Sequence, residues 1–152
     1  MNWRQPGIQV IFYVIAGLLI AACATVPMTG RQQLRLLPES QLRQMSMDNY
    51  QQVLKQEKLS NDQEQVAMVR RIGQDLAVAA EEYMKANGYP VQGYNWEFNL
   101  IEDDDTINAW CMPGGKVAVY TGLLPVAKNE NGLAVVMSHE IAHALADHGN
   151  ER

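Results

Sequence analysis

The fold is decided by the stretch NGLAVVMSHEIAHALADHGNER, which runs from Asn131 to Arg152. It contains the motif His139-Glu140-Ile141-Ala142-His143. Residues four apart on a helix differ by about 40° in azimuth and about 6 Å along the axis, so both imidazoles face one side and can share a metal ion. Apolar residues recur every one to four positions and predict an amphipathic helix; they are Leu133, Val136, Met137, Ile141, Ala144 and Leu145.

The residue types of this motif are those that zinc-dependent hydrolysis requires. A neutral imidazole pair suits Zn2+, which takes ligand nitrogens at about 2.0 to 2.1 Å. Glu140 lies about 100° around the helix from His139, close enough to reach a zinc-bound water without binding the metal. In this chemistry the zinc polarises the water, Glu140 accepts its proton, and the hydroxide attacks a peptide carbonyl. The alternative is a histidine pair on an unrelated helix, but two imidazoles and a carboxylate are costly on so apolar a helix unless they are paired or bind a metal.

A third protein ligand is not found close to the motif. His148 follows His143 by five residues and lies about 140° around the helix from it. Glu151 is about 12 Å further along the axis than His143, and metzincins have a histidine where this sequence has Gly149. A site with two histidines and one glutamate therefore requires a glutamate beyond Arg152, and we expect only weak zinc retention from the 152 residues.

Residues 1–22 have the pattern of a signal peptide. The segment Ile8–Ile20 carries no charge, and its length of about 13 to 15 residues is short of the roughly 20 that a membrane-spanning helix needs. It ends in Ile20-Ala21-Ala22-Cys23, which resembles the bacterial lipobox. The resemblance implies a diacylglycerol anchor on Cys23 and, from the Ala24 that follows, sorting to the periplasmic face of the outer membrane. A signal cleaved elsewhere, with Cys23 an ordinary residue, is the alternative.

The remaining sequence divides into a lipid-anchored tether, residues 23–37, and a domain, residues 38–152. A loosely amphipathic helix is expected from Pro38 to about Lys58. Ser60, with Gln63 three residues later, matches a capping box and predicts the start of a second helix, which Asn87-Gly88 ends.

Strands are expected after Asn95, where the hydrophobic period changes. The alternation from Trp96 to Ile101 predicts a strand with one face more buried than the other. The acidic run Glu102–Asp105 lacks the glycine and glutamate of an EF-hand loop, so a solvated turn is expected. Cys111 is expected to be a small buried side chain rather than a zinc ligand.

A hairpin over Asn108–Tyr120, with its turn at Pro113-Gly114-Gly115, completes the pattern. This hairpin and the H-E-x-x-H helix, at this separation, resemble the M48 family of zinc metallopeptidases, and the lipobox is similar to that of its bacterial lipoprotein members. The likeness extends from Leu59 to Arg152. It implies an α+β, predominantly helical, gluzincin-like fold with a small β-sheet beside the active-site helix, of which this chain is the N-terminal portion.

The resemblance also implies roles for individual residues. His139 and His143 would bind one zinc ion per subunit, Glu140 would be the general base, and a glutamate from a downstream helix would complete the site. Zincins hold extended substrates against an edge strand. The candidate substrate-binding residues Asn108, Gly114 and Gly115 would lie along the hairpin that serves this purpose, although the valines of the hairpin could equally well only pack the core.

Charge and composition narrow the class of partner. The chain has 12 Lys and Arg against 17 Asp and Glu and a net charge of -5, which argues against nucleic-acid binding. Only two cysteines occur, which excludes a disulfide scaffold.

These observations predict a zinc metalloendopeptidase of the bacterial cell envelope. Its expected role is protein quality control, with unfolded or misassembled envelope proteins as substrates and a lipid anchor holding it to the membrane. The alternative is a catalytically inactive, truncated lipoprotein that acts as a binding module through its exposed sheet edge.

Overall fold

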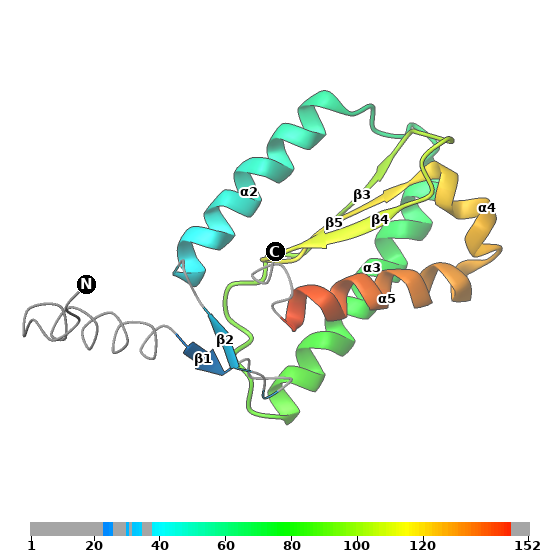
Figure 1. Cartoon of the computed structure of the whole chain (residues 1–152). Coiled ribbons are helices and arrows are strands. Elements are labelled where there is room, and N and C mark those ends of the chain that lie inside the picture. Colours follow the sequence, from blue (N-terminus) through cyan, green and yellow to red (C-terminus); the bar gives the residue numbers. More distant parts are fainter. Residues whose placement is uncertain (1–22, 26–29, 31, 35–37, 147–152) are drawn as a thin grey trace, which may run out of the picture.

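The computed structural model describes residues 23–25, 30, 32–34 and 38–146, and its core is a small sheet between two layers of helices (Figure 1). Within this part of the chain the regular elements are β1 (Cys23–Thr25), β2 (Gln32–Leu34), α2 (Glu39–Gln56), α3 (Gln63–Ala86), β3 (Glu97–Ile101), β4 (Ala109–Met112), β5 (Lys116–Tyr120), the 3-10 helix η1 (Thr121–Leu123), α4 (Leu124–Ala127) and α5 (Glu130–Leu145). The α+β fold class expected from the sequence is confirmed.

The sheet has the strand order β3-β5-β4, so β5 is central and β4 lies at an edge. β4 pairs with β5 as the predicted antiparallel hairpin, whereas β3 pairs with β5 in parallel. Figure 1 shows α2 on one face of the sheet and α3 with α5 on the other. The helices α3 and α5 cover the face that carries Phe98, Leu100, Val117 and Val119, all of which belong to the hydrophobic core.

The strand β3 was expected to have one face more buried than the other, and the structure differs from this expectation. All of its residues after Glu97 are buried. The reason is that a strand in a parallel pair is covered by helices on both faces, so the expected alternation of buried and exposed side chains is lost.

Helices α2 and α3 occupy the predicted ranges, but the capping box is wrong. Asp62, not Ser60, is the N-cap of α3, and its Oδ1 accepts hydrogen bonds from the backbone N–H of Glu64 and Gln65, both at 3.0 Å. Ser60 Oγ instead accepts from the backbone N–H of Asp62 at 3.2 Å. The other end is as predicted, because Asn87 caps α3 and Gly88 follows with a positive φ of 72°.

The acidic run forms a turn that is held by its own hydrogen bonds. Asp103 Oδ1 accepts from the backbone N–H of Asp105 at 3.0 Å and of Thr106 at 3.2 Å. Thr121 Oγ1 donates to Asp104 Oδ1 at 2.6 Å, which ties this turn to η1. These acids therefore cap a turn, as the sequence predicted.

Several expectations concern the ends of the chain. The predicted signal peptide, His148 and Glu151 lie outside the described residues. Within the predicted tether, β1 pairs antiparallel with β2, with Cys23 opposite Leu34. In the part of the chain that the structure describes, no helix is both long and apolar enough to cross a membrane.

Candidate functional site

Helix α5 carries the H-E-x-x-H motif and is fixed firmly in the domain. Its N-cap is Asn129, whose side chain accepts a hydrogen bond from the backbone N–H of Gly132 at 3.0 Å. Every fourth residue along its inner side, namely Leu133, Met137 and Ile141, is buried against α3 and the sheet. A helix anchored along its length in this way presents the motif on rigid backbone.

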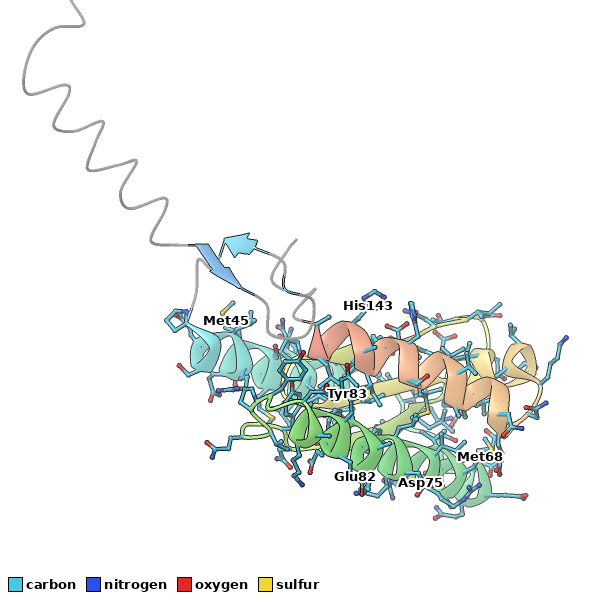
Figure 2. The ribbon with its side chains drawn as sticks, turned by 90° about the horizontal axis from the view of Figure 1, so that it is seen from below. Met45, Met68, Asp75, Glu82, Tyr83 and His143 are labelled. Atoms are coloured by element: carbon cyan, nitrogen blue, oxygen red, sulfur yellow. The ribbon has the colours of Figure 1, made fainter. Side chains whose placement is uncertain are left out.

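The two histidines face one another on the outer side of α5. His139 Nε2 and His143 Nε2 are 2.9 Å apart, and the rings are perpendicular with centroids 4.4 Å apart. Both side chains are exposed, and Figure 2 shows His143 projecting from the side of α5 that is turned away from α3. The predicted convergence of the two rings is thus present in the structure.

The spacing of these nitrogens fits a shared zinc ion. Two ligands at about 2.0 to 2.1 Å in a tetrahedral arrangement have their nitrogens about 3.4 Å apart. The observed 2.9 Å differs from this by an amount that a small rotation of either imidazole supplies. Among the described residues, no group of three or more His, Cys, Asp or Glu side chains is placed to hold a metal.

Glu140 lies on the side of α5 that faces the sheet edge. It is half-buried, and its charge acts on Cys111 of β4, which packs against α5. Burial raises the pKa of the Cys111 thiol to about 12, and the negative charge of Glu140 adds to the increase. Cys111 therefore remains a neutral thiol packed against the core, as the sequence predicted.

The edge strand β4 runs beside α5 and has one row of backbone groups directed outward. The backbone N–H of Tyr120 donates to the carbonyl of Asn108 at 3.1 Å, and Trp110 lies opposite Ala118. Since hydrogen-bonded and non-hydrogen-bonded pairs alternate in an antiparallel ladder, the N–H and C=O groups of Ala109 and Cys111 point away from β5. These groups are the ones an added strand would meet.

The candidate residues Gly114 and Gly115 lie in the hairpin turn rather than along this edge. Both have positive φ, 89° and 84°. Their carbonyl oxygens accept hydrogen bonds from the backbone N–H of Asn95 at 2.9 Å and of Glu97 at 3.0 Å. A Cβ on Gly115 would also lie 2.7 Å from the Trp96 ring. These glycines are explained by the turn and its contact with β3, and Asn108 alone of the three lies next to the edge strand.

A buried polar cluster on the opposite face of the sheet was not expected from the sequence. The Lys116 side chain is only 3% exposed, and its Nζ donates to Asn95 O at 2.6 Å and to Glu97 Oε2 at 3.2 Å. Asn99 Nδ2 donates to Tyr50 Oη at 2.8 Å and to Glu97 Oε1 at 3.1 Å. The one sequence signal was the alternation of Glu97 and Asn99 with apolar residues in the predicted strand from Trp96 to Ile101, which we interpreted as one less buried face.

Comparison with known proteins identifies relatives that are named as metalloendopeptidases or proteases. The chain is 51% identical over 57 residues to the mitochondrial metalloendopeptidase OMA1 of Schizosaccharomyces pombe, covering 38% of this chain and 17% of that protein. It is 30% identical over 126 residues to human OMA1, and the match covers 83% of this chain and 24% of that protein. It is 42% identical over 53 residues to the beta-barrel assembly-enhancing protease of Escherichia coli, covering 35% and 11%. The chain thus spans about a quarter or less of the length of these relatives.

These relatives overturn the predicted location. An outer-membrane, lipid-anchored position in a bacterial envelope is wrong, because the stronger matches are mitochondrial proteins and the bacterial ones align over shorter segments. The physical reason for the error is that a short apolar run before small residues and a cysteine carries little information about the compartment.

The family predicted from the motifs is confirmed. The model of peptidase family M48 matches residues 63–152, which include α3, the whole sheet and α5. The resemblance first drawn from the hairpin and the H-E-x-x-H helix therefore extends over the larger part of the sequence, and the chain belongs to peptidase family M48.

Proposed function

We propose that this chain carries the zinc-binding and proton-transfer residues of a zinc-dependent endopeptidase that acts on unfolded or misassembled proteins. The observation that supports this most directly is the pair of imidazole Nε2 atoms 2.9 Å apart, with Glu140 between them in sequence and turned toward the edge strand. The M48 family assignment and the metalloendopeptidase names of the relatives agree with it.

Each residue of the motif has a defined task. His139 and His143 would hold the zinc ion, and a glutamate from a downstream helix would be the third ligand, as the resemblance to the family implies. Bound zinc supplies Lewis-acid polarisation of water and of the scissile carbonyl. Glu140 accepts the proton of the attacking water and transfers it to the departing amide nitrogen.

The substrate binds along β4 in extended form. The outward N–H and C=O groups of Ala109 and Cys111 provide main-chain hydrogen bonds to a peptide laid beside the strand. Such bonds do not depend on side-chain identity and require that the substrate have an unpaired backbone. Unfolded or misassembled chains meet this requirement, which connects the geometry to a role in protein quality control.

The test is a comparison of Glu140→Gln with Glu82→Gln in the protein as its gene encodes it. Glu82 is exposed on α3 and is labelled in Figure 2, far from the motif, so it is a matched control for loss of one carboxylate. We expect Glu140→Gln to lower casein hydrolysis by about 10²- to 10⁴-fold, since a general base contributes that much, with the zinc content unchanged. Glu82→Gln should match the wild type.

Zinc content after dialysis tests the ligands separately. His139→Ala and His143→Ala should each reduce bound zinc measured by atomic absorption, since each removes one nitrogen ligand. Turnover that survives Glu140→Gln, or zinc that is retained when both histidines are replaced, would contradict the proposal. Zinc binding without any hydrolysis in the wild type would favour the non-catalytic binding module instead.

A further inference from the structure

We propose that helix α2 is a positioning element that holds the edge strand β4 in place from the face of the sheet opposite α5, through Tyr50 and Arg43. This inference rests on the proposed function in one respect, namely that β4 is the strand against which the substrate binds. Neither residue belongs to the metal-binding motif or to the outward edge of β4.

Tyr50 fits into a gap in the sheet surface. It is completely buried, the largest side chain of α2 to be so. The register places Asn99, Ala118 and Trp110 in one row across the three strands, so the small central Ala118 leaves space between its neighbours. The Tyr50 hydroxyl accepts a hydrogen bond from Asn99 at 2.8 Å, and its ring meets Trp110 edge-on, with centroids 5.9 Å apart at 87°. Tyr50 therefore joins the edge strand to β3 across the width of the sheet.

The buried polar cluster fixes the base of this gap. Lys116 Nζ lies 5.9 Å from the centroid of the Tyr50 ring and is itself held by Glu97. Asn99, which donates to Tyr50, also donates to Glu97. Because Lys116 and Asn99 are buried and have few alternative partners there, they define one position for the tyrosine ring.

Arg43, two helical turns before Tyr50 on α2, lies beside the hairpin turn that follows β4. Its side chain lies so close to Gly93 that a Cβ there would be 2.6 Å from Nη1. It also passes near the hairpin turn, where a Cβ on Gly114 would lie 3.9 Å from Cγ of Arg43. A narrow groove is lined by Leu42, Arg43, Gly93, Tyr94, Pro113, Gly114 and, from α5, Ala144. The end of the metal-binding helix, the turn of the hairpin and α2 thus meet at one place.

These two contacts have a consequence for substrate binding. Cys111 lies between the Trp110 that Tyr50 contacts and the turn that Arg43 contacts, and its outward backbone groups are part of the proposed substrate edge. Loss of either contact should loosen β4 while α3, α5 and the core between them remain packed. The expected result is a higher KM for peptide substrates, with the zinc content unchanged and kcat much less affected.

The experiment measures hydrogen exchange by mass spectrometry on Tyr50→Leu and Arg43→Gln. Tyr83→Leu and Arg70→Gln are matched controls, because both residues are exposed on α3. An aromatic edge-to-face contact corresponds to about 3- to 10-fold in an equilibrium constant. We therefore expect exchange in residues 108–114 to accelerate about 3- to 10-fold in Tyr50→Leu, with KM rising by a similar factor. Arg43→Gln should accelerate exchange in the same residues, and residues 133–141 of α5 should be unchanged in both variants. Tyr50→Phe, which keeps the ring, should restore most of the protection.

The outcomes separate this proposal from the proposed function. Unchanged exchange in residues 108–114 of either folded test variant, or equal acceleration in the α3 controls, would overturn the positioning role. If Tyr50→Leu unfolds the whole chain, Arg43→Gln and its control decide the question alone. A rise in exchange without any peptidase activity in the wild type would support the α2 contact while contradicting the proposed function, and a large fall in kcat with KM unchanged would show a structural role only.

Discussion

The two faces of the sheet are packed in different ways. Against α3 and α5 the sheet presents Phe98, Leu100, Val117 and Val119, and the interface is apolar. Against α2 it presents Asn99, Lys116 and Trp110, and a single tyrosine fills the space among them. An apolar, close-packed interface tolerates little displacement, so the helix that carries the H-E-x-x-H motif lies on the rigid face. The face that α2 covers depends on a few directed contacts and is easier to disturb.

Met137→Ala should have the largest effect and would break the apolar face directly. Met137 is completely buried beneath the two histidines, whereas Val135 on the same helix is 68% exposed. We expect Met137→Ala to lower the free energy of unfolding by about 2–5 kcal/mol and Val135→Ala by less than about 0.5 kcal/mol. Urea denaturation followed by circular dichroism measures both, and equal losses would show that α5 is not anchored as described.

Lys116→Met sharpens the contrast with the polar face. The substitution keeps the apolar stem but leaves the Asn95 carbonyl and Glu97 Oε2 without the buried Lys116 donor. The expected loss is about 1–3 kcal/mol in the free energy of unfolding. Lys58→Met, which removes an exposed ion pair with Glu102, should cost about 0–1 kcal/mol in the same denaturation experiment. A neutral or stabilising result for Lys116→Met would mean that the polar cluster only occupies volume.

Gly115→Ala tests the turn that joins β4 to β5. Gly115 and Gly88 both have positive φ, 84° and 72°, but only at Gly115 would the added Cβ meet another side chain, Trp96 at 2.7 Å. Left-handed backbone costs a residue with a Cβ about 1–2 kcal/mol, so both Gly115→Ala and the control Gly88→Ala should be destabilised. Gly115→Ala should lose about 1 kcal/mol more because Trp96 must move. Thermal melts of the two variants give the comparison, and identical melting temperatures would contradict the contact.

The smallest effect at neutral pH concerns Cys111, which titrates only in alkali. Burial and Glu140 raise its pKa from 9.0 to about 12, so above pH 9 the unfolded chain releases this proton before the folded one does. Stability is therefore unaffected below pH 9 and falls as the pH rises from 9 to 12. Denaturation midpoints of the wild type should decline more steeply over this range than those of Cys111→Ala. Parallel curves would show that the thiol is solvated.

Most predictions that rest on local sequence patterns agree with the structure. The ranges of α2 and α3 and the hairpin followed from local patterns, as did the mutual approach of His139 and His143. The N-cap of α3 was assigned wrongly because Ser60 and Asp62 both suit a cap, and only the path of the chain into the helix selects Asp62. The prediction that only one face of β3 is well buried was wrong, because alternating polar and apolar residues do not reveal that helices cover both faces of the sheet.

Features that depend on residues close along the chain follow from the sequence alone. A spacing of four residues brings two imidazoles to one side of any helix, and Pro113-Gly114-Gly115 turns any hairpin, because backbone geometry alone dictates both. Tertiary structure decided the parallel pairing of β3 with β5, the burial of Lys116, and the row of Asn99, Ala118 and Trp110 that receives Tyr50. These arrangements join residues far apart in the chain, and which of them form depends on how all the layers pack together.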